Sequence, residues 1–253
     1  MITASLLAWI GLMASSQEAP PPQAEAFRHF NDVKVRWDDE YLYVESNGMP
    51  DHPMMVGIKS WNQQVPIPHD YTGRNAFRIP LKPVPLKTPT ALPFIGPIAI
   101  AANGVPIFNP IKQDGRTDTF VHGELDEYGG HAGRGDDYHY HVLPLHLEKT
   151  VGNGQPLAWS LDGYPIFGLR EADGTRVRNL DASHGHRHED GTYHYHGSRS
   201  FPYMQASFHG RYDESLQPRA AGIRPATQPL REARVVDFDQ LDENEWELTY
   251  THR

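Results

Sequence analysis

The chain has 253 residues, carries a net charge of −9 at pH 7 and contains no cysteine. Its acidic balance argues against nucleic acid as a partner. The absence of cysteine excludes disulfides, cysteine-ligated zinc sites and thiol catalysis. A chain of this length can bury a sizeable core and forms one large domain or two small ones.

The first residues are typical of a secretory signal peptide. An apolar run at 6–13 is followed by small residues at 14–16 and then by a proline-rich stretch. The run is too short to span a membrane, and no later apolar stretch is long enough for a transmembrane helix. It lacks preceding basic residues, so an apolar N-terminal strand is the alternative. We expect a signal peptide at 1–16, a Pro-rich linker at 17–30, and a secreted or periplasmic mature chain without a membrane span.

Strand patterns begin after this linker. Residues 33–37 alternate in polarity, residues 41–45 are aromatic and β-branched, and the acidic residues 38–40 between them predict a hairpin turn. Residues 98–101 predict a short buried strand. Eight prolines in 64–97 exclude long helices and long central strands there.

The C-terminal part has a different composition. Prolines and arginines in 217–234 predict an extended arm over the surface, and residues 235–238 and 246–250 predict two closing strands. A weak helical pattern at 240–246 is the best helix signal in the chain. These patterns together predict a mainly β fold with long loops rich in glycine and proline and with little helix.

An internal repeat is the most informative feature of the sequence. Asn-Gly-Val-Pro-Ile-Phe at 103–108 is similar to Asp-Gly-Tyr-Pro-Ile-Phe at 162–167, and Gly-His-x6-Tyr-His-Tyr-His occurs at both 130–141 and 185–196. The blocks follow in the same order, so residues of about 98–143 and 157–197 are two copies of one unit. Two copies tend to pack with pseudo-two-fold symmetry, which predicts a single globular domain of two pseudo-symmetric β-rich repeats.

The repeated motif predicts metal ligands. In a strand, residues i and i+2 face the same side, so His139 shares a face with His141, and His194 shares one with His196. The Gly-His before each pair offers a third imidazole from the preceding loop. Three neutral imidazoles suit copper or zinc, whereas calcium prefers oxygen ligands. The predicted ligands are His131, His139, His141, His186, His194 and His196.

Other residues remain open candidates. His52 lies in a tight loop and can either reach the site or hold the turn, whereas His122, His146 and His188 have no counterpart in the other repeat. Asp126 and its counterpart Asp181 can orient a ligand imidazole or hold a turn. The alternative for the repeated histidines is a hydrogen-bonded core network without metal. No motif of a serine hydrolase, a phosphate loop or a His-Glu-x-x-His metalloprotease is present.

These motifs resemble a known family. The two Tyr-His-Tyr-His segments occur with an Asn-Gly-x-Pro-x-His loop at 47–52 and the Asp-Gly block at 162–167. This set is similar to the YHYH-domain proteins over roughly 33–208. The resemblance implies a secreted or periplasmic protein and no settled activity. Many members have cysteine in the block before Gly-His, where this chain has Tyr128 and Ser183, so a bridge at those positions is absent.

The sequence therefore predicts a YHYH-type domain at 31–215, with the two repeats inside it, and a C-terminal arm with closing strands at 216–253. The predicted function is that of an exported protein that binds copper or zinc through a duplicated three-histidine motif. The alternative is a metal-dependent enzyme, a copper oxidoreductase or zinc hydrolase, acting on a small-molecule or polymer substrate outside the cytoplasm. A domain with purely structural metal is the third hypothesis.

Overall fold

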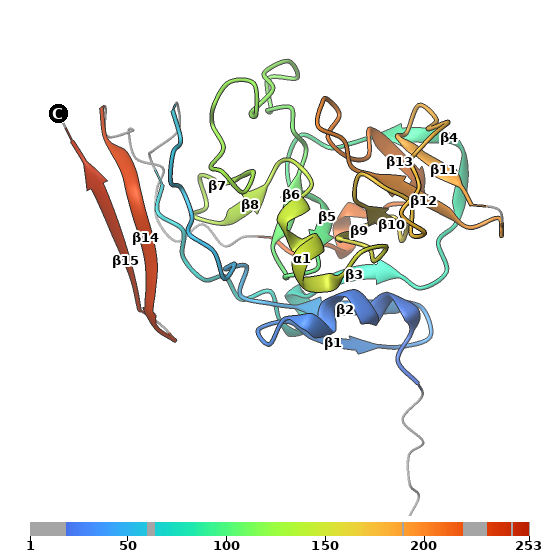
Figure 1. The fold of residues 1–253 in the computed structure, drawn as a ribbon. Helices are drawn as coiled ribbons and strands as arrows, with labels where there is room; N and C mark the ends of the chain where they lie inside the picture. The colour runs from blue at the N-terminus through green and yellow to red at the C-terminus, as the bar shows by residue number, and fades with distance from the viewer. Residues whose placement is uncertain (1–18, 60–63, 189, 220–231, 244, 253) are drawn as a thin grey trace, which may run out of the picture.

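The computed structural model describes residues 19–59, 64–188, 190–219, 232–243 and 245–252, which are coloured in Figure 1. The predicted signal peptide at 1–16 lies outside the described residues, as do 220–231 of the predicted C-terminal arm. The fold is mainly β, as predicted from the sequence. Helix is limited to α1 (Glu148–Val151) and to the short 3-10 helices η1 (Pro22–His29), η2 (Gly73–Asn75), η3 (Leu145–Leu147) and η4 (Glu214–Leu216) in the described part of the chain. No helix among the described residues has the length and apolar character needed to cross a bilayer.

An eight-stranded sheet contains both repeats. Its order is β11-β12-β10-β9-β5-β6-β8-β7. The first repeat contributes β5 (Pro97–Ala101), β6 (Pro106–Phe108), β7 (Gly130–Ala132) and β8 (Tyr138–Tyr140). The second contributes β9 (Ala158–Ser160), β10 (Pro165–Phe167), β11 (Gly185–Arg187) and β12 (Tyr193–His196). Each half therefore repeats the same strand order outward from the centre, and Figure 1 shows the β7–β8 and β11–β12 hairpins on opposite sides of β5 and β9.

A local two-fold axis passes between the two central strands. In the antiparallel β5–β9 pair, Ile100 lies opposite Trp159, and the repeated blocks make these two residues equivalent. Ala101 lies opposite Ala158, which is the counterpart of Ala99. Such an axis is perpendicular to the sheet and keeps equivalent side chains on the same face. The pseudo-symmetry predicted from the sequence is therefore present in the strand register.

Smaller sheets surround this one. The strands β1 (Lys34–Trp37), β2 (Tyr41–Glu45) and β3 (Phe77–Pro80) form an antiparallel sheet. Asp38 closes the predicted β1–β2 turn by accepting hydrogen bonds from the backbone N–H groups of Glu40 and Tyr41. Strand β4 (Pro85–Ala91) pairs with β13 (Ser207–Gly210). The strands predicted at 33–37, 41–45 and 98–101 are thus present as β1, β2 and β5.

The C-terminal strands β14 (Arg234–Asp242) and β15 (Glu245–Thr251) form a hairpin that lies beside the rest of the molecule (Figure 1). This confirms the two predicted closing strands. The weak helical pattern at 240–246 was misleading, because Gln240 pairs with Trp246 across the hairpin. Two side chains of β14, Val235 and Phe238, are buried, and the strand register shifts between Val235 and Asp237.

The predicted linker at 17–30 differs from the structure in its described part, residues 19–30; residues 17 and 18 lie outside the described residues. Residues 22–29 form the 3-10 helix η1, with proline in its first turn. Phe27 is fully buried in the core, and Gln23 donates a hydrogen bond to the Leu81 carbonyl. A buried aromatic side chain holds this segment on the domain, which the proline-rich composition did not reveal.

Candidate metal centres

Three histidines converge on one point in the first repeat. His131 on β7 lies directly opposite His139 on β8, and His141 follows two residues later. Their ring centroids are 4.8–5.0 Å apart, and all three side chains are buried. We call this cluster centre 1. The sequence placed His131 in a loop; the structure places it in a strand, where cross-strand pairing with His139 puts both on one face.

Backbone carbonyl groups fix the orientation of all three rings. The Nδ1 atom of His131 lies 3.0 Å from the Glu124 carbonyl oxygen. Those of His139 and His141 lie 2.9 and 2.6 Å from the carbonyl oxygens of Asp137 and Asn109. A carbonyl oxygen only accepts, so each Nδ1 carries the hydrogen and each Nε2 presents a lone pair. Centre 1 is therefore a set of three imidazoles held in one tautomer, with three nitrogen lone pairs that could bind a metal ion.

The spacing of the nitrogen atoms matches a shared ion. The Nε2 atoms of His131 and His141 are 3.1 Å apart. Two nitrogens at about 2.0–2.1 Å from one zinc ion are roughly 2.9 Å apart at a right angle and roughly 3.4 Å apart at the tetrahedral angle. Without a cation the two lone pairs repel each other, because neither Nε2 carries a hydrogen. The spacing of these two atoms is thus compatible with binding to one metal ion.

A proton shared between the Nε2 atoms of His131 and His141 could also relieve the repulsion of their lone pairs, but burial disfavours the charged form. Burial lowers the pKa of His131 well below its usual value, and it lowers the pKa of His141 to about 3; neighbouring histidines lower both further. Both imidazoles are therefore neutral at pH 7. Neutral imidazole is the form that binds metal.

The second repeat builds a cluster with a fourth ligand. The Nε2 atom of His186 lies 2.9 Å from that of His194 and 3.3 Å from that of His196. The carboxylate of Glu171 lies 3.2–3.5 Å from the three Nε2 atoms. Burial, together with His196 and His186, lowers the pKa of His194 to about 4. We call this cluster of Glu171, His186, His194 and His196 centre 2, and its four groups can together hold a metal ion.

Glu171 was not predicted from the sequence because the equivalent residue of the first repeat is not a glutamate. Glu171 is the fourth residue after Phe167, and the fourth residue after the equivalent Phe108 is Lys112. A search for ligands shared by both copies therefore passes over this position. A carboxylate shortly after a repeat strand was the available signal.

The glycine of each Gly-His pair makes room for a tyrosine. A Cβ atom on Gly130 would lie 2.5 Å from the hydroxyl oxygen of Tyr138, and one on Gly185 would overlap the hydroxyl of Tyr193. The two hydroxyl groups donate hydrogen bonds to the equivalent carboxylates of Asp126 and Asp181. The tyrosines thus lie on the face opposite the histidines, as strand alternation predicts.

Asp126 and Asp181 hold turns and do not touch the histidine rings. Asp126 Oδ1 accepts hydrogen bonds from the backbone N–H groups of Tyr128 and Gly130. Asp181 Oδ1 accepts the equivalent bonds from Ser183 and Gly185. The turn interpretation of these residues is therefore the correct one.

His52 and His146 lie on the tyrosine face. His52 Nε2 is 2.7 Å from the hydroxyl oxygen of Tyr140, and its ring stacks on Tyr128 at 3.8 Å. His146 lies edge-on to His52 at 5.0 Å. Neither belongs to the two clusters described above.

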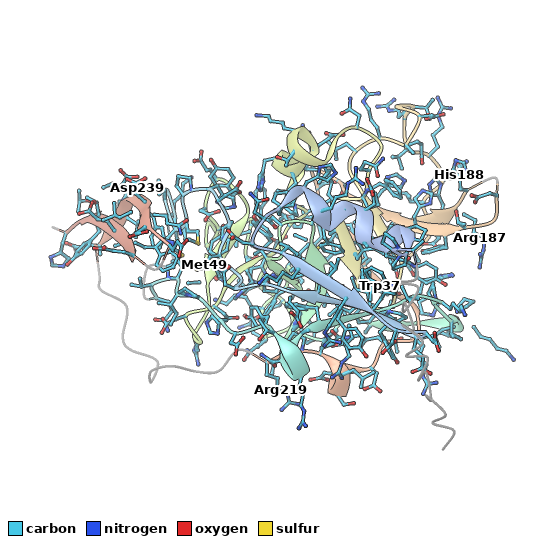
Figure 2. All side chains as sticks on the ribbon, turned by 90° about the horizontal axis from the view of Figure 1, so that it is seen from below. Trp37, Met49, Arg187, His188, Arg219 and Asp239 are labelled. Carbon is cyan, nitrogen blue, oxygen red and sulfur yellow. The ribbon has the colours of Figure 1, made fainter. Side chains whose placement is uncertain are left out.

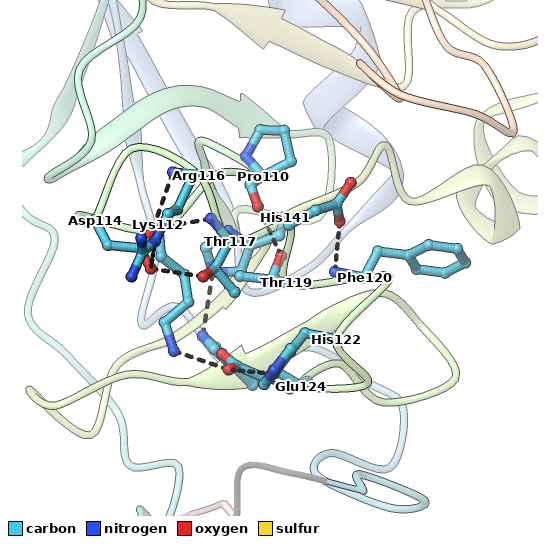
Figure 3. Close-up of polar contacts among 12 residues, drawn as sticks. Pro110, Lys112, Asp114, Arg116, Thr117, Thr119, Phe120, His122, Glu124 and His141 are labelled. Carbon is cyan, nitrogen blue, oxygen red and sulfur yellow. Dashed lines mark hydrogen bonds and ion pairs between the residues drawn. The ribbon is translucent and has the colours of Figure 1, made fainter.

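His122 and His188 also lie outside the clusters. His122 Nδ1 is 3.2 Å from Glu124 Oε1 (Figure 3). His188 lies with Arg187 at the outer end of the β11–β12 hairpin (Figure 2), and its ring centroid is 6.2 Å from that of His194.

The two centres are separate and each borders a cavity. Five strand steps lie between β8 and β12, which is roughly 24 Å at about 4.8 Å per step. Centre 1 opens on a cavity of about 340 Å³ whose walls include Phe94, Phe108, Lys112 and Glu124. His194 and Glu171 of centre 2 border a cavity of about 600 Å³. The histidines of the two repeats therefore form two separate clusters.

Residues 76–177 match the model of the YHYH protein family. This match confirms, over these residues, the resemblance that the motifs indicated. It contains all of centre 1 together with Glu171, and it ends before the three histidines of centre 2. Comparisons with curated proteins and with solved structures found no match to this chain.

Proposed function

We propose that this YHYH protein binds two transition-metal ions, copper or zinc, one in each repeat. The observation that supports this most strongly is the orientation of the centre 1 rings. Three backbone carbonyl groups accept hydrogen bonds from the Nδ1–H groups of His131, His139 and His141. The Nε2 lone pairs of the three rings therefore face one point. A hydrogen-bonded core network, the alternative without metal, needs donors among these Nε2 atoms, and that tautomer provides none.

Centre 2 supports the same proposal with a different ligand set. Three imidazoles and the Glu171 carboxylate supply four ligands, which is the usual coordination number of zinc in proteins. The clusters contain no sulfur ligand, so both favour an ion that accepts nitrogen and oxygen donors. The total predicted content is two ions per chain.

Metal analysis of protein purified without a histidine tag tests this proposal. Metal-free protein is loaded with copper or zinc, the excess is removed, and the bound ions are counted by mass spectrometry. We expect two ions per chain, and one in each of the variants His139→Ala and His194→Ala. The control His188→Ala removes a histidine of the same tract and should keep two. The proposal is wrong if the wild type retains no more copper or zinc than the double variant His139→Ala/His194→Ala.

Export is part of the proposed function. The apolar run at 6–13 and the small residues at 14–16 support a removable leader. Expression in a bacterial host with cell fractionation should place the protein outside the cytoplasm, with a mass corresponding to cleavage after Ser16. Uncleaved protein confined to the cytoplasm would contradict this part of the proposal.

A metal-dependent enzyme, a copper oxidoreductase or a zinc hydrolase, is the second candidate function. The observation that favours it is the cavity of about 340 Å³ beside centre 1, which gives a substrate access to the three histidines. An oxidase and esterase screen on the metal-loaded protein separates this candidate from binding alone. Turnover that disappears in His139→Ala but persists in His188→Ala supports the enzyme.

A further inference from the structure

The two repeats differ at one position that bears on coordination. In centre 2 this position is Glu171, whose carboxylate faces the three Nε2 atoms. In centre 1 the equivalent residue is Lys112, whose ammonium group lies 2.8 Å from Glu124 Oε1. A protonated lysine has no lone pair and cannot ligate a metal ion. Centre 1 therefore supplies three protein ligands where centre 2 supplies four.

Lys112, the sequence counterpart of Glu171, lines a cavity beside centre 1. The three histidines, Lys112 and Glu124 all line the space of about 340 Å³. Figure 3 shows the Lys112 ammonium group and the His122 ring converging on the Glu124 carboxylate. Only Oε1 takes part in these contacts.

The second carboxylate oxygen of Glu124, Oε2, suggests that the cavity holds a hydrogen-bond donor. The Glu124 side chain is 3% exposed, and its Oε2 atom has no hydrogen-bond partner among the described residues. A buried carboxylate oxygen without a partner is costly, so a donor is expected beside it. A water molecule bound in the cavity is such a donor.

The charges of the two centres favour different occupants. Three neutral imidazoles leave the charge of a divalent ion uncompensated in centre 1, whereas Glu171 offsets part of it in centre 2. The charged side chains around the centre 1 cavity are of both signs and nearly balance: Lys112, Arg134, Asp114, Glu124 and Asp137. The ion itself therefore sets the local potential, which attracts an anion.

We propose that centre 1 takes an exchangeable ligand from its cavity, a water molecule or a small anion that replaces it, whereas centre 2 fills the same position with Glu171. This inference rests on the proposed binding of two metal ions. It makes centre 1 the reactive centre of the pair, because three protein ligands with one open position is the pattern of catalytic metal sites. Centre 2 has four protein ligands, the number found in closed zinc sites, although Glu171 and His194 also border a cavity.

Azide titration of the copper-loaded protein tests the inference. Azide is a small anion that binds copper(II) with a new charge-transfer absorption band, and the number bound per chain is read from the titration. We expect one azide per wild-type chain and none in His139→Ala, which retains only centre 2. Glu171→Ala should bind two, because it opens the second centre. The control Glu127→Ala, which removes an exposed glutamate from the loop before His131, should bind one.

The copper content of each variant is measured first, so that the two proposals fail separately. A wild-type chain that binds no copper overturns the proposed function. A chain that binds two ions and no azide, or that binds azide only at centre 2, overturns this inference alone. If Glu171→Ala folds poorly, Glu171→Gln replaces it, since it keeps the size of the side chain and removes the charged ligand.

Discussion

A neutral imidazole carries one hydrogen and one lone pair, and the backbone decides which nitrogen of each centre 1 histidine keeps the hydrogen. The carbonyl groups of Glu124, Asp137 and Asn109 each come from a different segment of the first repeat. The ligand set is therefore oriented by the main chain, which substitutions at these three positions leave in place. The side chains there remain available for other roles, as Glu124 shows.

Substitution of Gly130 or Gly185 by alanine is expected to destabilise the fold. A Cβ atom at Gly130 or Gly185 would overlap the tyrosine that packs over it. We predict that Gly130→Ala and Gly185→Ala each lower the free energy of unfolding by about 1–3 kcal/mol, as measured by urea denaturation of the metal-free protein.

The matched control is Gly168→Ala. Its added Cβ would meet neighbouring atoms at 3.6 Å or more, which is ordinary contact, and its carbonyl oxygen continues to accept from His196. This variant should differ from the wild type by less than about 1 kcal/mol. Equal effects at Gly168 and Gly130 would show that the tyrosine contact does not matter.

The histidine hairpins are the elements that sequence patterns predicted best. Strand alternation in Tyr-His-Tyr-His places its two imidazoles on one face. His139 could therefore be paired with His141, and His194 with His196, from the sequence alone. The repeat then supplied the pseudo-symmetry. The pairing of His131 with His139 could not be read, because a three-residue strand such as β7 has no periodicity of its own.

The remaining elements needed tertiary information. Residues 22–29 form η1 because Phe27 enters the core, and the local composition of the segment favours a linker instead. Glu171 lies between strands, and its place in centre 2 depends on how the 168–176 loop returns toward the hairpin. The path of this loop cannot be predicted from the spacing of residues.

At the scale of the whole molecule, buried histidines make the metal-free fold sensitive to acid. Burial lowers the pKa of His141 to about 3 and those of His146 and His194 to about 4. The unfolded chain takes up protons on these groups near pH 6.5 and the folded chain does not. Their contribution to stability is therefore complete above pH 6.5 and is lost as the pH falls toward 4.

We predict that the metal-free protein loses unfolding free energy between pH 6.5 and 5.5, and that the fully buried His141 alone accounts for about 1 kcal/mol of this loss. Urea titrations at the two pH values measure the change. The variant His146→Gln should reduce the loss, by less than about 1 kcal/mol because His146 is only partly buried, whereas substitution of the exposed His122 should leave it unchanged. A midpoint that is independent of pH over this range would contradict the prediction.

The register of β5 and β9, with Ile100 opposite Trp159, is the arrangement of an isologous dimer whose two halves have been joined in one chain. In a homodimer of identical subunits, any substitution in one ligand set appears in the other as well. Joining the halves removes that constraint. A single chain can then have a glutamate in one half and a lysine at the equivalent position of the other, so that the two copies of one pocket differ in the groups around their histidines.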